Sequence, residues 1–168
     1  NKEILKPFVE KLNQEKIKNE TPKYFYEQLT KGNLYKGPVL EWYCKVKVRL
    51  ENYYEPFHAL LPRNGKFYDL GCGNGFMSLM LHWAAPDRHF VGVDYDEEKV
   101  ANAQNHYARN AKFIFSKKAP RGSQYVFENP AIRFETADVT QFSLQACNGI
   151  IISDVLHYLV PKEQEALL

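Results

Sequence analysis

Residues 66–75, Lys-Phe-Tyr-Asp-Leu-Gly-Cys-Gly-Asn-Gly, decide the fold of this chain. An apolar and partly aromatic run ends in three glycines, Gly71, Gly73 and Gly75, and apolar residues at helical spacing follow from Phe76 onward. This order predicts a strand, a tight turn and a helix, which is the first half of a βαβ unit. Glycines let the backbone approach a ligand closely, and the start of the next helix offers free N–H groups. The turn therefore indicates a site for a nucleotide-like ligand.

The spacing of the glycines separates classes of nucleotide site. A dinucleotide fingerprint has its third Gly or Ala three residues after the second, but here Phe76 occupies that position and Gly75 comes one residue early. No Gly-Lys-Ser/Thr sequence follows, which excludes a P-loop. The spacing therefore weakens the pyrophosphate interpretation. A glycine-rich turn that binds nothing is the structural alternative.

The composition is that of one globular domain. Hydrophobic residues make up 45% of the 168 residues and charged residues 25%, with a net charge of +2 and both signs interspersed, so there is no broad basic field for nucleic acid. Cys44, Cys72 and Cys147 lie far apart, which indicates no metal site and a reducing compartment. No apolar run reaches membrane-spanning length. We expect a cytoplasmic protein, and the first residue, Asn1, suggests a domain tethered in a longer chain.

Three further predicted strands each lead to an acid. These strands span residues 89–94, 131–135 and 148–153. Asp94 ends the first of them, and Asp138 and Asp154 follow the other two. A carboxylate at Asp94 can accept two hydrogen bonds from a ribose diol, although helix capping is the alternative there. For Asp138 the alternative is an Asx turn.

The sequence Asp69-Leu70-Gly71-Cys72-Gly73-Asn74-Gly75, with Asp94, Asp138 and Asp154 at successive strand ends, resembles the class I S-adenosylmethionine (SAM)-dependent methyltransferases. The resemblance covers roughly residues 66–159. It implies an α/β fold with a Rossmann-like sheet, in which the strand order 3-2-1-4 is present and the later strands of the family are missing. It also implies that SAM is the cofactor. The cofactor-binding residues that it implies are Asp69, Gly71, Cys72, Gly73, Asn74, Gly75, Asp94, Tyr95, Asp138, Val139 and Ser153.

Residues 1–61 are expected to form a helical layer ahead of the SAM-binding half-domain, residues 62–168. Apolar spacing and turn residues predict helices over 1–20, 21–31 and 39–61, the last one breaking near Pro56 and stopping before Pro62. Aromatic packing in a core explains much of this region. The resemblance implies in addition that the layer covers the cofactor as a lid. The residues expected to line an acceptor pocket are Tyr35, Trp42, Tyr43 and Asp154.

Residues 111–130 are predicted to form an inserted hairpin. The preceding helix is expected from Glu97 to about Asn110, and two β-like pieces, 112–116 and 124–127, then flank a turn rich in Lys, Pro and Gly. A helix of a βαβ unit returns the chain to the edge where strands begin, whereas ligands bind at the opposite edge. The insertion is therefore expected to point away from the cofactor, as a surface feature or as an arm that binds a partner.

The implied reaction is transfer of the SAM methyl group to a small-molecule or lipid-like acceptor. The family's Asn/Asp-Pro-Pro-aromatic signature for methylation of nucleobases is absent, which argues against a nucleic-acid partner. If the acceptor needs a base, His157 or Tyr158 is best placed, just beyond the fourth strand; both have core packing as their alternative. An NAD-dependent oxidoreductase and a non-catalytic methyltransferase-like module are the rival functions.

Two finer expectations complete the prediction. Residues 37–43, 94–99 and 153–159 are similar to the methyltransferase domain at the C-terminus of Bacteroidetes multidomain lipid-transport and acyltransferase proteins. The fourth strand, rich in isoleucine and without charge or proline, is expected to form an exposed sheet edge in this polypeptide. We therefore predict self-association through that strand.

Overall fold

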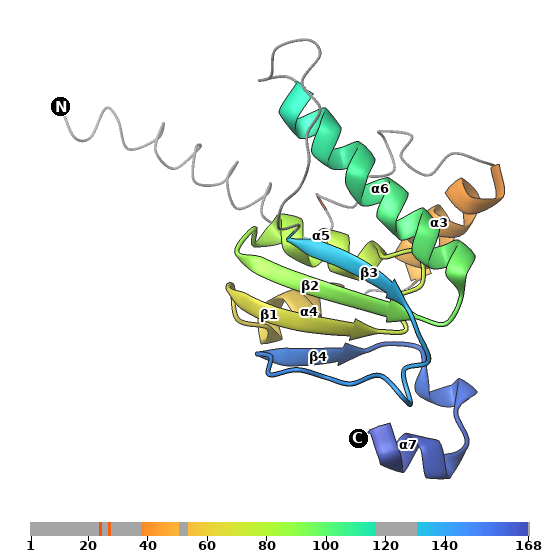
Figure 1. The fold of residues 1–168 in the computed structure, drawn as a ribbon. Helices are drawn as coiled ribbons and strands as arrows, with labels where there is room; N and C mark the ends of the chain where they lie inside the picture. The colour runs from red at the N-terminus through yellow and green to blue at the C-terminus, as the bar shows by residue number, and fades with distance from the viewer. Residues whose placement is uncertain (1–23, 25–26, 28–37, 51–53, 117–130, 168) are drawn as a thin grey trace.

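The computed structural model describes residues 24, 27, 38–50, 54–116 and 131–167 (Figure 1). The helices predicted over residues 1–20 and 21–31 lie outside the described residues, apart from Tyr24 and Glu27, which are helical. Tyr35 and the predicted β-like piece 124–127 also lie outside them. Among the helices in the described ranges, none is both long enough and apolar enough to cross a membrane.

A parallel sheet of four strands forms the centre of the part of the chain that the structure describes. The strands are β1 (Gly65–Leu70), β2 (Arg88–Asp94), β3 (Ile132–Thr136) and β4 (Gly149–Ile152), in the order β3-β2-β1-β4. Asp69 on the central strand β1 is in register with Gly92 on one side and with Ile151 on the other. The predicted order 3-2-1-4 is confirmed. All four strands point to the same edge in Figure 1, so the loops that follow them share one side of the sheet.

The two faces of the sheet carry separate cores, because successive side chains of a strand point to opposite faces. On one face, Phe67 and Phe90 are buried with their ring centroids 5.5 Å apart. Residues of α5 (Phe76–Ala84) and α6 (Glu97–Ser116) complete this core. The opposite core is built from the alternate residues of β1 and β2, namely Tyr68, Leu70, Val91 and Val93. Both faces are therefore covered, as a parallel sheet requires.

In the described ranges 38–50 and 54–60, two helices lie directly ahead of the sheet, α3 (Pro38–Leu50) and α4 (Tyr54–Leu60). They pack against α5 through a small core of Cys44, Tyr54, Phe76 and Met80. The predicted break near Pro56 is confirmed to within a few residues, because the segment is divided into α3 and α4, and Pro56 lies in the first turn of α4. A proline in that turn lacks only an N–H that the helix does not use. The predicted stop before Pro62 is confirmed, since α4 ends at Leu60.

The side chain of Arg88 joins the end of α4 to the start of β2. It is completely buried, and its guanidinium donates hydrogen bonds of 2.7–3.2 Å to backbone oxygens. The acceptors are the carbonyls of His58, Leu61, Pro62 and Leu81. Carbonyls at helix ends have no helical partner, and the planar fork of an arginine can satisfy several of them at once. Arg88 therefore fixes α4 and α5 to the sheet at the edge where β2 begins.

Helix α6 is longer than predicted. Its backbone is helical from Glu97 to Ser116, so the strand expected over residues 112–116 was wrong. A β preference of individual residues is easily overridden by their surroundings. Residues 111–116 also contain no glycine or proline that would end the preceding helix. The end of α6 and the start of β3 lie away from the edge where the strands end (Figure 1).

Candidate functional site

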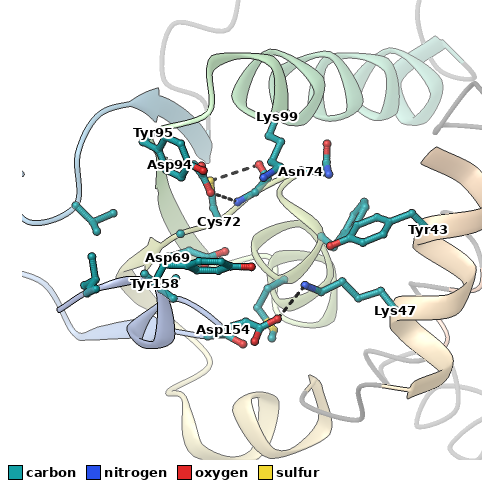
Figure 2. Close-up of a pocket in the computed structure, with 18 of the residues that line it drawn as sticks. Tyr43, Lys47, Asp69, Cys72, Asn74, Asp94, Tyr95, Lys99, Asp154 and Tyr158 are labelled. Carbon is teal, nitrogen blue, oxygen red and sulfur yellow. Dashed lines mark hydrogen bonds and ion pairs between the residues drawn. The ribbon is translucent and has the colours of Figure 1, made fainter. Parts of the chain in front are cut away.

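A cavity of about 670 Å³ lies at the edge where the strands end, and α3 forms its opposite wall (Figure 2). The predicted cofactor-binding residues that line it are Asp69, Gly71, Cys72, Gly73, Asn74, Asp94, Tyr95, Asp138, Val139 and Ser153. The predicted acceptor and catalytic residues that line it are Tyr43, Asp154 and Tyr158. Gly75, Trp42 and His157 are not part of its lining. The structure thus brings together residues that follow all four strands of the sheet and residues of two helices, α3 and α4, from the N-terminal part of the chain.

The glycine loop has the backbone conformation that its glycines permit. Gly71, Gly73 and Gly75 have φ angles of 79°, 52° and 76°, in the left-handed region that side chains disfavour. A Cβ atom on Gly71 would overlap the side chain of Val155. A Cβ atom on Gly73 would meet only Cδ of Lys99, at 4.0 Å. The space over Gly73 is therefore open for the close approach of a ligand.

Gly75 does not line the cavity, and its role is structural. It is the N-cap residue of α5. A Cβ atom on it would lie 2.6 Å from the ring of Phe134 and 2.9 Å from Cβ of Ala103. The close packing of β3 and α6 on the loop therefore requires a glycine at this position.

Asp94 joins the glycine loop to the end of β2. Its Oδ2 accepts a hydrogen bond from the N–H of Gly73 at 2.8 Å, and its Oδ1 accepts one from the N–H of Asp96 at 2.9 Å. The residue is 7% exposed, so the carboxylate is held in one orientation at the cavity wall. Each carboxylate oxygen has two lone pairs, so both can still accept a hydrogen bond from a ligand.

Asp69 lies behind the loop and is almost completely buried, with 2% exposed. Its Oδ2 accepts a hydrogen bond of 2.6 Å from the hydroxyl of Ser78, in the first turn of α5. Burial raises the pKa of Asp69 to about 6, and the hydrogen bond from Ser78 and the charge of Lys47 oppose that rise. The ionised fraction of the Asp69 carboxyl group therefore depends on its burial, on the hydrogen bond from Ser78 and on the charge of Lys47.

Asp154 stands at the end of β4 between two basic side chains. Its Oδ2 is 3.6 Å from Nζ of Lys47 on α3, and its Oδ1 is 3.8 Å from Nδ1 of His157. Its φ angle of 63° is in the left-handed region, which aspartate tolerates better than most residues. The ring of His157 lies 3.9 Å from that of Tyr158, measured between centroids. Of these two aromatic residues, Tyr158 points into the cavity in Figure 2.

Residues 62–167 match the family model described as a methyltransferase domain. The chain belongs to this methyltransferase family. A curated relative, the secondary metabolism regulator laeA of Monascus pilosus, is 39% identical over 54 residues, which are 32% of this chain and 15% of that protein. The short match concerns only part of the domain.

Solved structures show the same fold. Magnesium protoporphyrin IX methyltransferase from Synechocystis PCC 6803, solved with bound SAM, is 23% identical with a TM-score of 0.52, over 82% of this chain and 61% of that one. A TehB-like SAM-dependent methyltransferase from Corynebacterium glutamicum ATCC 13032 is 18% identical with a TM-score of 0.51, over 73% of this chain and 58% of that one. This chain therefore spans less than two thirds of the length of each of these proteins.

The methyltransferase cavity contains residues that sequence reasoning missed. They are Lys47, Tyr54, Phe76, Met77, Lys99, Val155 and Leu159. Lys47 stands four residues after Tyr43, so the two side chains share a face of α3, and Nζ of Lys47 lies 5.7 Å from the centroid of the Tyr43 ring. That spacing was visible in the sequence once Tyr43 had been assigned to the pocket. Trp42, by contrast, is 65% exposed and belongs to another side of the helix.

Asp138 forms the Asx turn that was its structural alternative, and it also lines the methyltransferase cavity. Its Oδ1 accepts hydrogen bonds from the hydroxyl and the N–H of Thr140, at 2.7 and 2.9 Å. These bonds, with the hydroxyl bond first, lower the pKa of Asp138. The turn therefore holds an ionised carboxylate at the cavity edge.

Proposed function

We propose that this methyltransferase domain transfers a methyl group from SAM to a small-molecule or lipid-like acceptor. The observation that carries the proposal is the junction of the glycine loop and Asp94 at one cavity, where the N–H of Gly73 donates to Asp94 at 2.8 Å. The open space over Gly73 and the fixed carboxylate fit the close approach of a nucleoside. The family match and the shared fold support the same cofactor.

The residues present fit the parts of SAM in order along the cavity. Asp94 would hold the ribose hydroxyls through charge-assisted hydrogen bonds. Tyr95 is 78% exposed and lines the cavity beside it, so its ring is open to stack on the adenine. Asp138 and the backbone of Val139 would hold the edge of the base. The sulfonium and the amino-acid part of SAM would then lie at the glycine loop and Asp69.

The charge of the lining favours SAM over a nicotinamide dinucleotide. The lining contains four carboxyl groups, those of Asp69, Asp94, Asp138 and Asp154, against the ammonium groups of Lys47 and Lys99. An acidic surface attracts a sulfonium and repels a pyrophosphate dianion. An NAD-dependent oxidoreductase is therefore the less favoured function, which agrees with the position of the third glycine of the loop, Gly75.

When bound, SAM supplies an activated methyl group, so the chain has to orient the acceptor and exclude water. The helices α3, α4 and α5 contribute three aromatic side chains to the lining, Tyr43, Tyr54 and Phe76, which we refer to as the aromatic wall. The acceptor is expected between this wall and Tyr158. Tyr158 points into the cavity, so we propose it as the group that accepts the proton of a hydroxyl acceptor. His157, whose ring centroid is 3.9 Å from that of Tyr158, is proposed as a positioning residue.

Binding measurements test the proposed cofactor. Calorimetry should show that S-adenosylhomocysteine (SAH), the demethylated product, binds and that NAD does not. Binding of NAD alone would contradict the proposal. Incubation of the full-length protein with SAM and candidate acceptors then separates an enzyme from a non-catalytic module, because only the enzyme forms SAH at a rate that depends on the acceptor.

We propose a cytoplasmic location, no nucleic-acid partner and an unmetallated site. We also propose the N-terminal part, residues 1–61, as a cap over residues 62–168, and the context of a larger lipid-transport and acyltransferase protein. The entry of Tyr43 and Lys47 from α3 into the cavity wall supports the cap.

A further inference from the structure

Lys47 crosses from the helical layer to the strand ends. It lies on α3, and its ammonium group is 3.6 Å from Oδ2 of Asp154, which follows β4. The same group lies over the ring of Tyr43, 5.7 Å from its centroid. The side chain is 25% exposed, and it lines the cavity. A positive charge is therefore held at the cavity wall by residues from two separate parts of the chain.

The position of this charge along the cavity matters for the cofactor. On the proposed function, adenine and ribose lie near Tyr95 and Asp94, so the amino-acid end of the cofactor lies on the other side of the glycine loop. Figure 2 shows Tyr95, Asp94 and Lys99 on one side of the cavity and Asp154 and Lys47 on the other. The charge of Lys47 also acts on Asp69, where it opposes the rise in pKa that burial causes. Lys47 thus lies within electrostatic reach of the loop that holds the amino-acid end.

The amino-acid end carries a carboxylate as well as an ammonium group, and the surrounding acids suit only the ammonium. Asp69 and Asp154 would repel a carboxylate unless a cation lay beside it. Of the two lysines in the described lining, Lys99 is on the Asp94 side and pairs with Asp96 at 3.2 Å. Lys47 is on the required side.

We propose that Lys47 binds the carboxylate of the cofactor's amino-acid end and exchanges Asp154 for it. This inference rests on the proposed function. The pair that is given up is weak, because its N–O separation of 3.6 Å is long and the side chain of Asp154 is 50% exposed. A charge-assisted hydrogen bond to the ligand in the loop is shorter and better shielded from water. α3 is thereby the helix that contacts the charged end of the cofactor.

The test compares two ligands on matched variants of the full-length protein. SAH carries the carboxylate, and decarboxylated SAH lacks it but keeps the amine. Lys47→Met retains most of the apolar stem of the side chain and removes its charge. We expect Lys47→Met to weaken SAH about tenfold and to change the affinity for the decarboxylated ligand by less than about twofold, because only one ligand loses a charge-assisted bond. Lys47→Arg should retain most of the affinity for SAH.

The control is Lys162→Met, which removes an exposed charge on α7 (Pro161–Leu167), outside the cavity. It should leave both affinities unchanged. Equal losses for both ligands in Lys47→Met would overturn the proposal, because Lys47 would then only hold α3 in place. No loss for either ligand would overturn it as well. If the wild-type protein binds neither ligand, the proposed function itself fails, which is a distinguishable result.

Discussion

The N–H of Gly73 donates to Oδ2 of Asp94 at 2.8 Å, and this bond joins the turn after β1 to the end of β2. The two residues are distant in sequence, and the parallel pairing of β1 with β2 brings their strand ends together. A hydrogen bond to a carboxylate is stronger than one between neutral groups. The cavity wall is therefore built before any ligand arrives, and the ribose-binding carboxylate is already oriented.

The first prediction concerns Asp94. Asp94→Ala should weaken SAH at least about tenfold, or about 1.4 kcal/mol, because it removes both acceptors proposed for the ribose and also releases Gly73. Isothermal titration calorimetry measures the change. Asp87→Ala, at an exposed acid just before β2, is the matched control and should bind as the wild type does. Equal affinity of Asp94→Ala and the wild type would remove Asp94 from the site.

The second prediction separates two glycines of the loop. Gly75→Ala should lower the free energy of unfolding by about 1–3 kcal/mol, because its new Cβ atom would lie 2.6 Å from the ring of Phe134. Gly73→Ala has room for its Cβ atom and bears only the cost of its left-handed backbone, about 1 kcal/mol. Denaturant unfolding compares the two. The affinity for SAH should fall more in Gly73→Ala than in a folded Gly75→Ala, since only Gly73 lines the cavity.

The third prediction follows from the buried carboxyl of Asp69, whose pKa burial raises to about 6. The unfolded chain loses this proton near pH 4, as an ordinary aspartate does, whereas the folded chain keeps it to about pH 6. The folded state therefore binds more protons in that window, and the contribution of Asp69 to stability falls as the pH rises through it. The full effect is about 3 kcal/mol, since each unit of pKa difference corresponds to about 1.4 kcal/mol.

Asp69→Asn checks this sign. The amide oxygen can still accept the hydrogen bond from Ser78 but does not ionise. The difference in unfolding free energy between the variant and the wild type should grow in favour of the variant from about pH 4 to pH 7. Urea unfolding at several pH values measures that difference, and other titrating groups cancel from it. Curves that stay parallel would show that Asp69 ionises normally in the folded protein.

The fourth prediction concerns Arg88. Arg88→Met should cost about 1–3 kcal/mol of stability, because it leaves the carbonyls of His58, Leu61 and Pro62 without this donor at a site where the guanidinium is completely buried. Arg133→Met is the control: its exposed ion pair with Glu135 should contribute less than about 1 kcal/mol. Thermal or denaturant unfolding distinguishes them. A loss for Arg88→Met as small as that for Arg133→Met would mean that water replaces the guanidinium.

Much of this fold could be predicted because its determinants are local. The strand that ends in Asp69 and Leu70 and the helix from Phe76 to Ala84 follow from apolar runs and glycine spacing, and the structure confirms both. Residues 112–116 were mispredicted as a strand because their β propensity was weighed without the preceding helix. That helix continues through them, since no glycine or proline ends it before Ser116. Lys47 was missed because its role depends on where α3 lies in three dimensions. The choice between His157 and Tyr158 likewise depends on side-chain direction, which adjacent positions in a sequence do not reveal.

The last prediction concerns β4. Among the described residues β4 pairs with β1 on one side and forms the edge of the sheet on the other. The strand Gly149–Ile152 contains no charge, proline or bulge, and Ile150 is 44% exposed. An unprotected apolar edge recruits another strand. We therefore predict that the polypeptide of residues 1–168 self-associates through β4, and that Ile150→Lys, which places a charge on the edge strand, reduces the association.

The control for this prediction is Val160→Lys. It changes an apolar residue that is 58% exposed outside the sheet, and it should not reduce the association. Light scattering over a range of concentrations measures the mass, and a wild-type polypeptide that stays monomeric at high concentration would contradict the prediction.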